Sequence, residues 1–235
     1  IDKRAHIINY SGGGTEPNDD ELKAVKDAGD VRDEANGIKE GILFIAAAGN
    51  ERSNSDISPY YPADYKLNNI VSVTAIDSFA KVLKTSNFGQ KTVDLAAPGE
   101  GIYSTLPGGK FGLMTGTSQA TAFVTGVAAL ILSHNKDFTA NQVKKQILAT
   151  VDELPGLRDK TRTGGKLNSY AALAIQPPIA ATGITSNATA NPGVGLVGTD
   201  NDLEASNVGA TGASGLMKAL DQERLATAPP QPARP

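Results

Sequence analysis

The stretch Gly112-Leu-Met-Thr-Gly-Thr-Ser118-Gln-Ala-Thr-Ala-Phe-Val-Thr-Gly-Val-Ala-Ala-Leu-Ile-Leu132 organises the rest of this chain. It begins with glycine and threonine, and a helical period then sets in. Apolar residues recur at spacings of three and four: Val124, Val127, Ala128, Ile131 and Leu132. This is the pattern of a helix with one buried face. Ser118 therefore lies where a glycine-rich loop becomes the first turn of a buried helix.

The position of Ser118 suits a nucleophile, although it also suits a structural role. Backbone N–H groups in the first turn of a helix have no partner within the helix, and the helix dipole is positive there. Negative charge developing near Ser118 would therefore be stabilised. However, a serine near a helix start is more often an N-cap than a catalyst. This stretch alone leaves both interpretations open.

The composition narrows the class of protein. Of the 235 residues, 40% are hydrophobic and 20% are charged, which is typical of a globular protein with a core. The net charge is −3 and no basic face is visible, so we expect no nucleic-acid partner. Cysteine is absent, which excludes disulfides, thiolate metal sites and cysteine nucleophiles. No apolar run reaches the length of a membrane span, so none is expected.

Four apolar runs predict the strands of a sheet. Residues 41–48 are apolar without polar alternation, which is typical of a strand buried on both faces in a parallel sheet. Shorter runs at 5–11, 70–77 and 93–99 predict three further strands, the first of them also buried. Residues 101–106 and 110–114 predict a hairpin around Pro107. The fold class expected is α/β, with a mostly parallel sheet flanked by helices.

Three more helices are predicted. The first runs from residue 19 to about residue 37, and its expected core face is Leu22, Val25, Ala28 and Ala35. The second follows a Thr139 cap, and the third covers residues 167–175. From residue 176 onward the sequence lacks the apolar density to build a core. We therefore predict a globular part at 1–175 and a low-complexity linker or tail at 176–235.

Two polar or glycine-rich segments have competing interpretations. The glycines at 12–14 could form a phosphate loop, and with it a nucleotide-binding α/β protein, but the Lys-Ser/Thr of that motif does not follow. Glycines also let an extended peptide pair with an exposed strand edge. Asp19, Asp20 and Glu21 could bind calcium, but an acidic first turn of a helix explains them more simply.

Six segments, taken in order, resemble the subtilisin-like serine protease family. They are Ile8-Asn9-Tyr10-Ser11, Ala47-Ala48-Gly49-Asn50, Tyr61-Pro62-Ala63, Ser86-Asn87-Phe88-Gly89, Ala97-Pro98-Gly99 and Gly116-Thr117-Ser118-Gln119-Ala120. Each segment alone is a weak signal, whereas six in this order and spacing are a strong one. The resemblance covers about residues 5–175 and corresponds to the later part of that family's catalytic domain.

The resemblance implies roles for particular residues. Ser118 would be the nucleophile, and the Asn50 side chain would form the oxyanion hole together with the backbone N–H of Ser118. The remaining expected site residues would bind a polypeptide substrate. Ser11, Gly12 and Gly13 match the edge strand that pairs with the substrate backbone, and Ala47, Ala48 and Gly49 match the wall of the pocket for the side chain before the cut bond.

The chain departs from the family pattern at three positions. Ala122 and Phe123 stand where proline and histidine usually follow the serine motif, and we expect this to alter packing rather than activity. Gly12 stands where leucine is common, which would open a subsite to bulky side chains.

The largest departure is the absence of the serine's catalytic partners. A serine hydroxyl needs a histidine to take its proton, and the histidine needs a carboxylate to orient it. His6 lacks the Gly-Thr that follows the family's histidine, and His134 lies sixteen helical residues from Ser118, or about 24 Å. Asp2 and Asp77 lack the family's Asp-Ser/Thr-Gly context. Neither partner is recognisable in this chain.

Two explanations follow. Either the Asp and His come from an N-terminal segment or a second chain, or the chain is a non-catalytic peptide-binding or structural module. Because the chain opens at an internal strand of the family's fold, we expect a sheet incomplete at its N-terminal side. We favour a serine endopeptidase that is inactive as this chain alone. By resemblance we also expect a secreted, bacterial-type protein, with Ca²⁺ as a candidate cofactor.

Overall fold

The computed structural model describes residues 5–33, 35, 38 and 40–174. Its elements, in chain order, are β1 (Ile7–Tyr10), α1 (Asp19–Asp30), β2 (Leu43–Ala47), β3 (Ile70–Ile76), β4 (Leu95–Pro98), β5 (Ile102–Leu106), β6 (Lys110–Met114), α2 (Thr117–His134), α3 (Ala140–Ala149), β7 (Asp152–Glu153), a 3₁₀ turn η2 (Pro155–Leu157), β8 (Gly165–Lys166) and α4 (Ser169–Ala174). The predicted tail at 176–235 lies outside the described residues.

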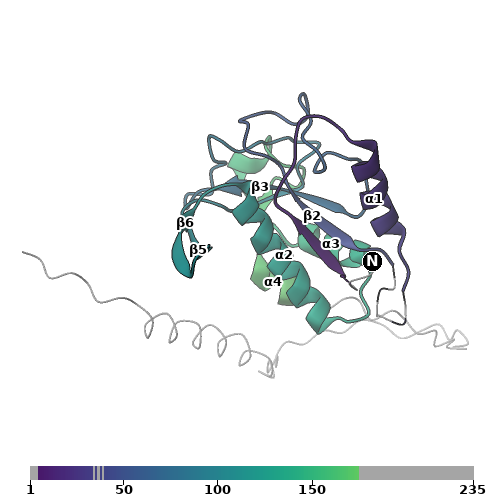
Figure 1. The fold of residues 1–235 in the computed structure, drawn as a ribbon. Helices are drawn as coiled ribbons and strands as arrows, with labels where there is room; N and C mark the ends of the chain where they lie inside the picture. Colours follow the sequence, from purple (N-terminus) through teal and green to yellow (C-terminus); the bar gives the residue numbers. More distant parts are fainter. Residues whose placement is uncertain (1–4, 34, 36–37, 39, 175–235) are drawn as a thin grey trace, which may run out of the picture. The chain divides into compact units, whose positions relative to one another are not determined.

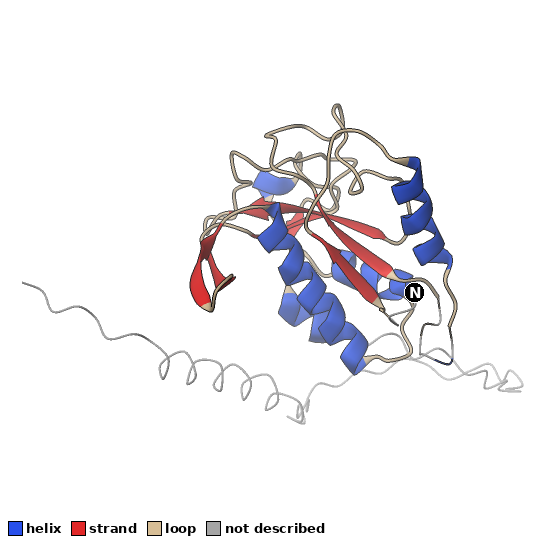
Figure 2. Cartoon of the chain, viewed as in Figure 1, coloured by secondary structure: helices blue, strands red, loops and turns tan. Residues whose placement is uncertain are grey.

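The main sheet has the order β1-β2-β3-β4-β8-β7 (Figure 1). Strands β1 to β4 are parallel and follow one another in sequence, β8 is parallel to β4, and β7 is antiparallel to β8. Helices lie on both sides of this sheet (Figure 2). The predicted α/β class with a mostly parallel sheet is therefore confirmed.

Strand β2 explains how the two faces are covered. Leu43 and Ile45 point into the core that α2, α3 and α4 complete, whereas Phe44 and Ala46 point into a second core beneath α1. All five residues of β2 are buried. Successive side chains of a strand alternate between faces, so a strand covered on both sides needs apolar residues throughout. This is why residues 41–48 show no polar alternation.

Strand β1 differs from its prediction as a buried strand. Three of its residues are half-buried, and Asn9 is exposed. The reason is its place in the sheet, because β1 pairs with β2 on one side and with no other strand among the described residues. The described sheet therefore has an open edge at β1, on the side where incompleteness was expected.

Helix α1 is shorter than predicted. It begins as expected, with the Asn18 side chain accepting a hydrogen bond from the Glu21 N–H, but it ends at Asp30. No basic residue lies in its last turn to stabilise the negative end of the helix dipole. The backbone is extended at Val31, whose carbonyl accepts from the Gly41 N–H. Ala35 is consequently exposed and was wrongly placed on the core face.

The later elements follow the predictions with small shifts. The strand predicted at 93–99 is shorter and covers only Leu95–Pro98 as β4. The last helix starts at Ser169 after Asn168, whose side chain accepts from the Ala171 N–H. Thr139 forms the predicted cap of α3, with a reciprocal contact to Gln142. The two-residue strands β7 and β8 have no counterpart among the predictions, because two residues are too few for a period to be recognised.

Candidate active site

Three segments distant in sequence meet at the carboxyl end of the parallel strands. Ser11 follows β1, Asn50 follows β2, and α2 begins at Thr117. Side-chain hydrogen bonds join all three segments, so the sequence-predicted residues Ser11, Asn50 and Ser118 lie in one place. The carboxyl edge is where open α/β sheets usually bind their ligands.

The Asn50 side chain is fixed at the start of α2. Its Oδ1 accepts hydrogen bonds from the Thr117 N–H at 3.0 Å and the Thr117 hydroxyl at 3.2 Å. Asn50 is exposed, and its Nδ2 makes no hydrogen bond within the described part of the chain. The amide is therefore oriented by its oxygen, and its N–H donors remain available at the first turn of the helix.

Glycine at position 116 permits this close approach. A Cβ there would lie 3.4 Å from Asn50 Oδ1 and 3.2 Å from Gln119 Oε1, at a φ of 155°. A side chain at this position would crowd the amide that caps the helix start. The Gly-Thr-Ser order thus has a local physical reason.

Ser11 and Ser118 are joined by two reciprocal hydrogen bonds. The Ser118 hydroxyl donates to the Ser11 carbonyl at 3.2 Å, and the Ser11 hydroxyl donates to the Ser118 carbonyl at 3.1 Å. Asn9 supports the pair, since its amide donates to the Ser11 hydroxyl at 2.9 Å and accepts from the Thr125 hydroxyl at 2.8 Å. Strand β1 and the residues after it are thereby held against the first half of α2.

Asn87 holds the loop that carries Asn50, a role that the sequence did not reveal. Its Nδ2 donates to the Ala48 carbonyl and to Glu51 Oε2, both at 2.8 Å. Its Oδ1 accepts from the N–H groups of Glu51 and Ser53, at 2.9 and 3.0 Å. The residue is buried, so this amide acts as a clamp around the turn after β2.

The other predicted substrate-binding residues lie beside this clamp and beside β1. Ala47 and Ala48 are buried at the end of β2, and Gly49 accepts from the Asn87 N–H through its carbonyl. Gly12 and Gly13 are exposed, and Gly14 pairs with Tyr61 in an antiparallel bridge. The extended segment after β1 and the end of β2 thus have the arrangement of two walls.

Neither histidine is near Ser118. His6 is exposed before the amino end of β1, where its carbonyl accepts from the Leu43 N–H. His134 is the last residue of α2, at the opposite end of that helix from Ser118. Asp77 Oδ1 accepts from two backbone N–H groups of its own turn, which is a structural role. Asp2 lies outside the described residues.

The sequence matches the family model described as the subtilase family over residues 1–195. This chain belongs to the subtilase family. The "Subtilisin" of Bacillus pumilus is 38% identical over 155 residues, which covers 66% of this chain and 52% of that protein. The "Major intracellular serine protease" of Bacillus subtilis (strain 168) is 37% identical over 139 residues, or 58% of this chain and 40% of that protein.

Solved structures support the same assignment. The "Prenylagaramide maturation protease PagA" superposes with a TM-score of 0.60 at 31% identity, covering 73% of this chain and 62% of that one. The fold is therefore subtilisin-like. This subtilase chain spans about half the length, or less, of the curated relatives quoted above. Within the described residues no helix is long and apolar enough to cross a membrane.

The outer face of α2 exposes two large apolar side chains. Phe123 and Leu130, which lie two turns apart, keep 43% and 47% of their surface exposed. A cavity of about 440 Å³ lies between this helix and the start of β1, lined by His6, Ile7, Ala129, Leu132, Ser133 and Lys136. Phe123 is one of the predicted departures from the family pattern, and it adds an aromatic ring to this face.

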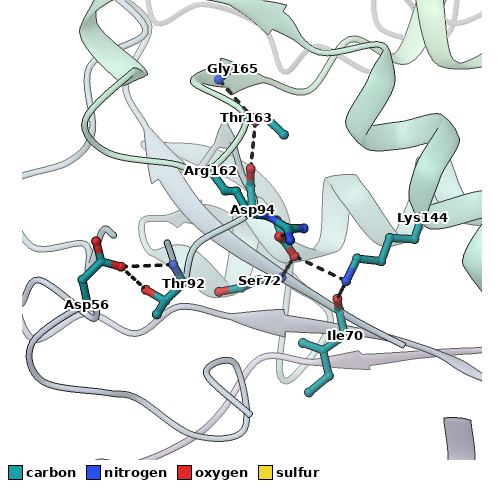
Figure 3. A network of polar contacts seen from close by, with 9 residues as sticks. All are labelled: Asp56, Ile70, Ser72, Thr92, Asp94, Lys144, Arg162, Thr163 and Gly165. Atoms are coloured by element: carbon teal, nitrogen blue, oxygen red, sulfur yellow. Dashed lines mark hydrogen bonds and ion pairs between the residues drawn. The ribbon is translucent and has the colours of Figure 1, made fainter. Parts of the chain in front are cut away.

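A second polar cluster surrounds the buried carboxylate of Asp94 (Figure 3). Asp94 Oδ1 pairs with Arg162, while Oδ2 accepts from the Ser72 N–H at 3.1 Å and lies 4.0 Å from the Lys144 ammonium. Lys144 also donates to the Ile70 carbonyl. Burial lowers the pKa of Lys144, and the Asp94 charge opposes that shift. The cluster ties α3 and the loop before β8 to the sheet.

The described side chains provide few ligands for a calcium ion. No group of three or more acidic, histidine or cysteine side chains that could hold a metal occurs within the described ranges. The Asp94 carboxylate already forms ion pairs with Arg162 and Lys144. Glu21 accepts from the hydroxyls of Tyr10 and Tyr65, at 3.1 and 3.2 Å. The acidic start of α1 therefore fits its interpretation as a helix start better than as a calcium site.

Proposed function

We propose that this subtilase chain is the serine and oxyanion-hole part of a serine endopeptidase. Ser118 Oγ would attack the carbonyl carbon of a peptide bond, and the Asn50 Nδ2 and the Ser118 N–H would donate to the developing oxyanion. The observation that carries the proposal is the pair of hydrogen bonds from Thr117 to Asn50 Oδ1. These bonds hold the amide oxygen against the first turn of α2, which leaves Nδ2 as the end of the amide that could donate to an oxyanion.

The chemistry needs a base that this chain does not provide. A bond forms between Ser118 Oγ and the carbonyl carbon, the C–N bond breaks, and the hydroxyl proton must reach the leaving amine. Water then hydrolyses the acyl-enzyme and regenerates the hydroxyl. The sequence has two histidines, and both lie at the far end of the strands or of α2. We therefore propose that a histidine and an aspartate come from a polypeptide segment outside these 235 residues.

The surface around Ser118 supports a catalytic domain that is completed by a second polypeptide segment. The open edge of β1 and the apolar cavity between β1 and α2 form one uncovered region, and the side chains of Phe123 and Leu130 are exposed elsewhere on α2. Burying such side chains contributes about 1.5–3 kcal/mol each. An N-terminal half of the catalytic domain, in the same or a separate chain, would cover this region and place its histidine near Ser118.

A non-catalytic peptide-binding module is the alternative. It is favoured by the hydrogen bond from the Ser118 hydroxyl to the Ser11 carbonyl, since a hydroxyl has one proton and here donates it to a backbone carbonyl rather than to a base. The two functions differ in one observable property. The enzyme forms a covalent bond to an electrophile at Ser118, whereas the binding module does not.

A fluorophosphonate probe tests the proposal on the chain together with the polypeptide that precedes it. We expect labelling that disappears in Ser118→Ala and persists in Ser133→Ala, the matched control at the other end of α2. Labelling that survives Ser118→Ala would show that another residue is the nucleophile. Complete absence of labelling, with the protein folded, would favour the peptide-binding module.

Compartment and metal remain part of the proposal. A secreted protein was expected from the resemblance, but one of the bacterial relatives carries the name intracellular, so the family leaves the compartment open. Calcium also stays a proposal, for which the described side chains offer no group of three ligands.

A further inference from the structure

The ring of Tyr60 lies between the two segments predicted to hold the substrate. A Cβ added to Gly13 would lie 2.5 Å from Tyr60 Cε1, and one added to Gly49 would lie 2.9 Å from Tyr60 Cγ. Both glycines have positive φ, at 153° and 103°. The ring is therefore in close contact with the backbone of both walls, where only glycine leaves room for it.

Several contacts hold Tyr60 in this place. Its N–H donates to Asp64 Oδ2 at 2.6 Å. The next residue, Tyr61, exchanges two backbone hydrogen bonds with Gly14, at 3.0 and 2.7 Å. The segment 60–61 is thus fastened to the strand that contains Gly13. The hydrogen bonds made by the backbone of Tyr60 and Tyr61 therefore fix the place from which the Tyr60 ring extends.

The surroundings of the ring are partly closed to water. Burial raises the pKa of the Tyr60 hydroxyl, and the nearby charges of Glu51 and Tyr10 raise it further. Glu51 is itself fixed by the Asn87 amide, and its Oε2 would lie 2.4 Å from a Cβ on Gly49. The Glu51 carboxylate therefore lies against the same wall as the Tyr60 ring and narrows the space further.

We propose that Tyr60 fills most of the pocket between Gly13 and Gly49, so that the site takes peptides with glycine, alanine or serine before the cut bond. This inference rests on the proposed function only for the location of the cut bond. The physical reason is that an aromatic ring already occupies the space between two backbone walls. A second large side chain could enter only by displacing that ring from its contacts, and overpacking of this kind costs about 1–3 kcal/mol.

The preference for a small residue in the Tyr60 pocket is separate from the open subsite expected at Gly12. A missing side chain at Gly12 concerns a neighbouring position of the substrate, because successive residues of an extended strand point to opposite faces. One substrate can therefore combine a bulky residue at that position with a small residue in the Tyr60 pocket.

Peptide binding to the chain combined with the complementary half of the catalytic domain tests the proposal, and every residue of the Tyr60 pocket lies within the 235 residues. The chain carries Ser118→Ala so that no peptide is cut. Two fluorescent peptides are compared by anisotropy, identical except for alanine or phenylalanine at the position before the expected cut. We expect alanine to bind about tenfold more tightly, a difference typical of a pocket that rejects a larger apolar group.

Substitutions at Tyr60 sharpen the test. Tyr60→Gly should remove or reverse the preference for alanine, and the matched control Tyr60→Phe, which keeps the ring, should preserve it. Equal or tighter binding of the phenylalanine peptide to the chain with Tyr60 intact would overturn the inference, even if Tyr60→Gly failed to fold. Binding of neither peptide would overturn it as well. The fluorophosphonate experiment is independent, since it reports on Ser118 and not on this preference.

Discussion

The amide oxygen of Asn50 accepts hydrogen bonds from both the N–H and the hydroxyl of Thr117, at 3.0 and 3.2 Å. Thr117 is fully buried and is the first residue of α2. The loop after β2 is thereby attached to the helix that carries Ser118. This contact holds the amide oxygen at the start of α2, so that the end of the Asn50 side chain left free to donate is Nδ2.

The first prediction concerns that donor. Asn50→Ala should lower kcat of the complete protease and leave KM nearly unchanged, because the lost hydrogen bond forms mainly in the transition state. In subtilisin, a member of the same family, loss of such a donor lowers turnover by about 10²–10³-fold. Thr117→Val should give a smaller loss, since the backbone N–H still binds Asn50. Unchanged kcat in Asn50→Ala would rule out its oxyanion role.

The placement of Asn50 and Ser118 at one edge of the sheet could be predicted from the sequence, whereas the contacts that support it could not. Ser118 follows a glycine-rich loop and Asn50 ends an apolar strand, so both carry local signals that place them at one edge of the sheet. Asn87 and Tyr60 carry no such signal. Each acts through contacts with residues more than ten positions away, and a polar residue in a loop gives no periodicity from which those partners could be inferred.

The second prediction tests the Asn87 clamp. Asn87→Ala would leave the Ala48 carbonyl and the N–H groups of Glu51 and Ser53 without this partner. Because Asn87 is buried, we expect a loss of about 2–4 kcal/mol in the free energy of unfolding, measured by urea denaturation. Asn141→Ala, at an exposed position of α3, should change it by less than about 0.5 kcal/mol. Equal effects of the two substitutions would contradict the clamp.

The third prediction follows from Asp64. Burial raises its pKa from the usual 3.8 to about 6, against the opposing effect of the Tyr60 N–H. Its Oδ1 is buried and has no hydrogen-bond partner within the described residues. The folded chain therefore binds a proton more tightly than the unfolded chain. The stability cost of this charge is present above pH 6 and is relieved as the pH falls from about 6 to 4.

Asp64→Asn isolates this effect, because an amide oxygen can still accept from the Tyr60 N–H. At pH 8 the substitution should raise the free energy of unfolding by about 1–2 kcal/mol, after allowance for partial exposure of the carboxyl. At pH 4 it should change little. The measurement is urea denaturation at both pH values, with Asp77→Asn as a control in an exposed turn. A gain of the same size at both pH values would show that titration of Asp64 is not its cause.

The fourth prediction separates the partners of Asp94. Lys144→Met removes a donor from the Ile70 carbonyl but leaves Asp94 paired with Arg162 and Ser72. We expect a loss of about 1–3 kcal/mol, the size of one hydrogen bond to a charged group. Asp94→Asn should cost more, about 3–5 kcal/mol, because it leaves the half-buried Lys144 ammonium without a countercharge.

Lys145→Met is the matched control for this cluster, since Lys145 is the exposed neighbour of Lys144 on α3. It should shift the midpoint of thermal unfolding by a degree or two at most, as surface substitutions do. If Lys144→Met and Lys145→Met had the same midpoint, the ion cluster would contribute nothing measurable to the attachment of α3.

The fifth prediction concerns two uncovered surfaces, the open edge of β1 and the outer face of α2. An open strand edge and two large exposed apolar side chains favour association with other polypeptides and leave the adjoining core thinly covered. We therefore expect residues 1–235 alone to unfold at low temperature or to self-associate. Circular dichroism melting and sedimentation velocity measure the two outcomes.

Adding the complementary half of a catalytic domain should raise the melting temperature of the chain, and Phe123→Ser together with Leu130→Ser should weaken that gain. A cooperative, monomeric transition at high temperature for the chain alone would mean that these surfaces need no cover, and the proposed division of the protease into two parts would lose its structural support.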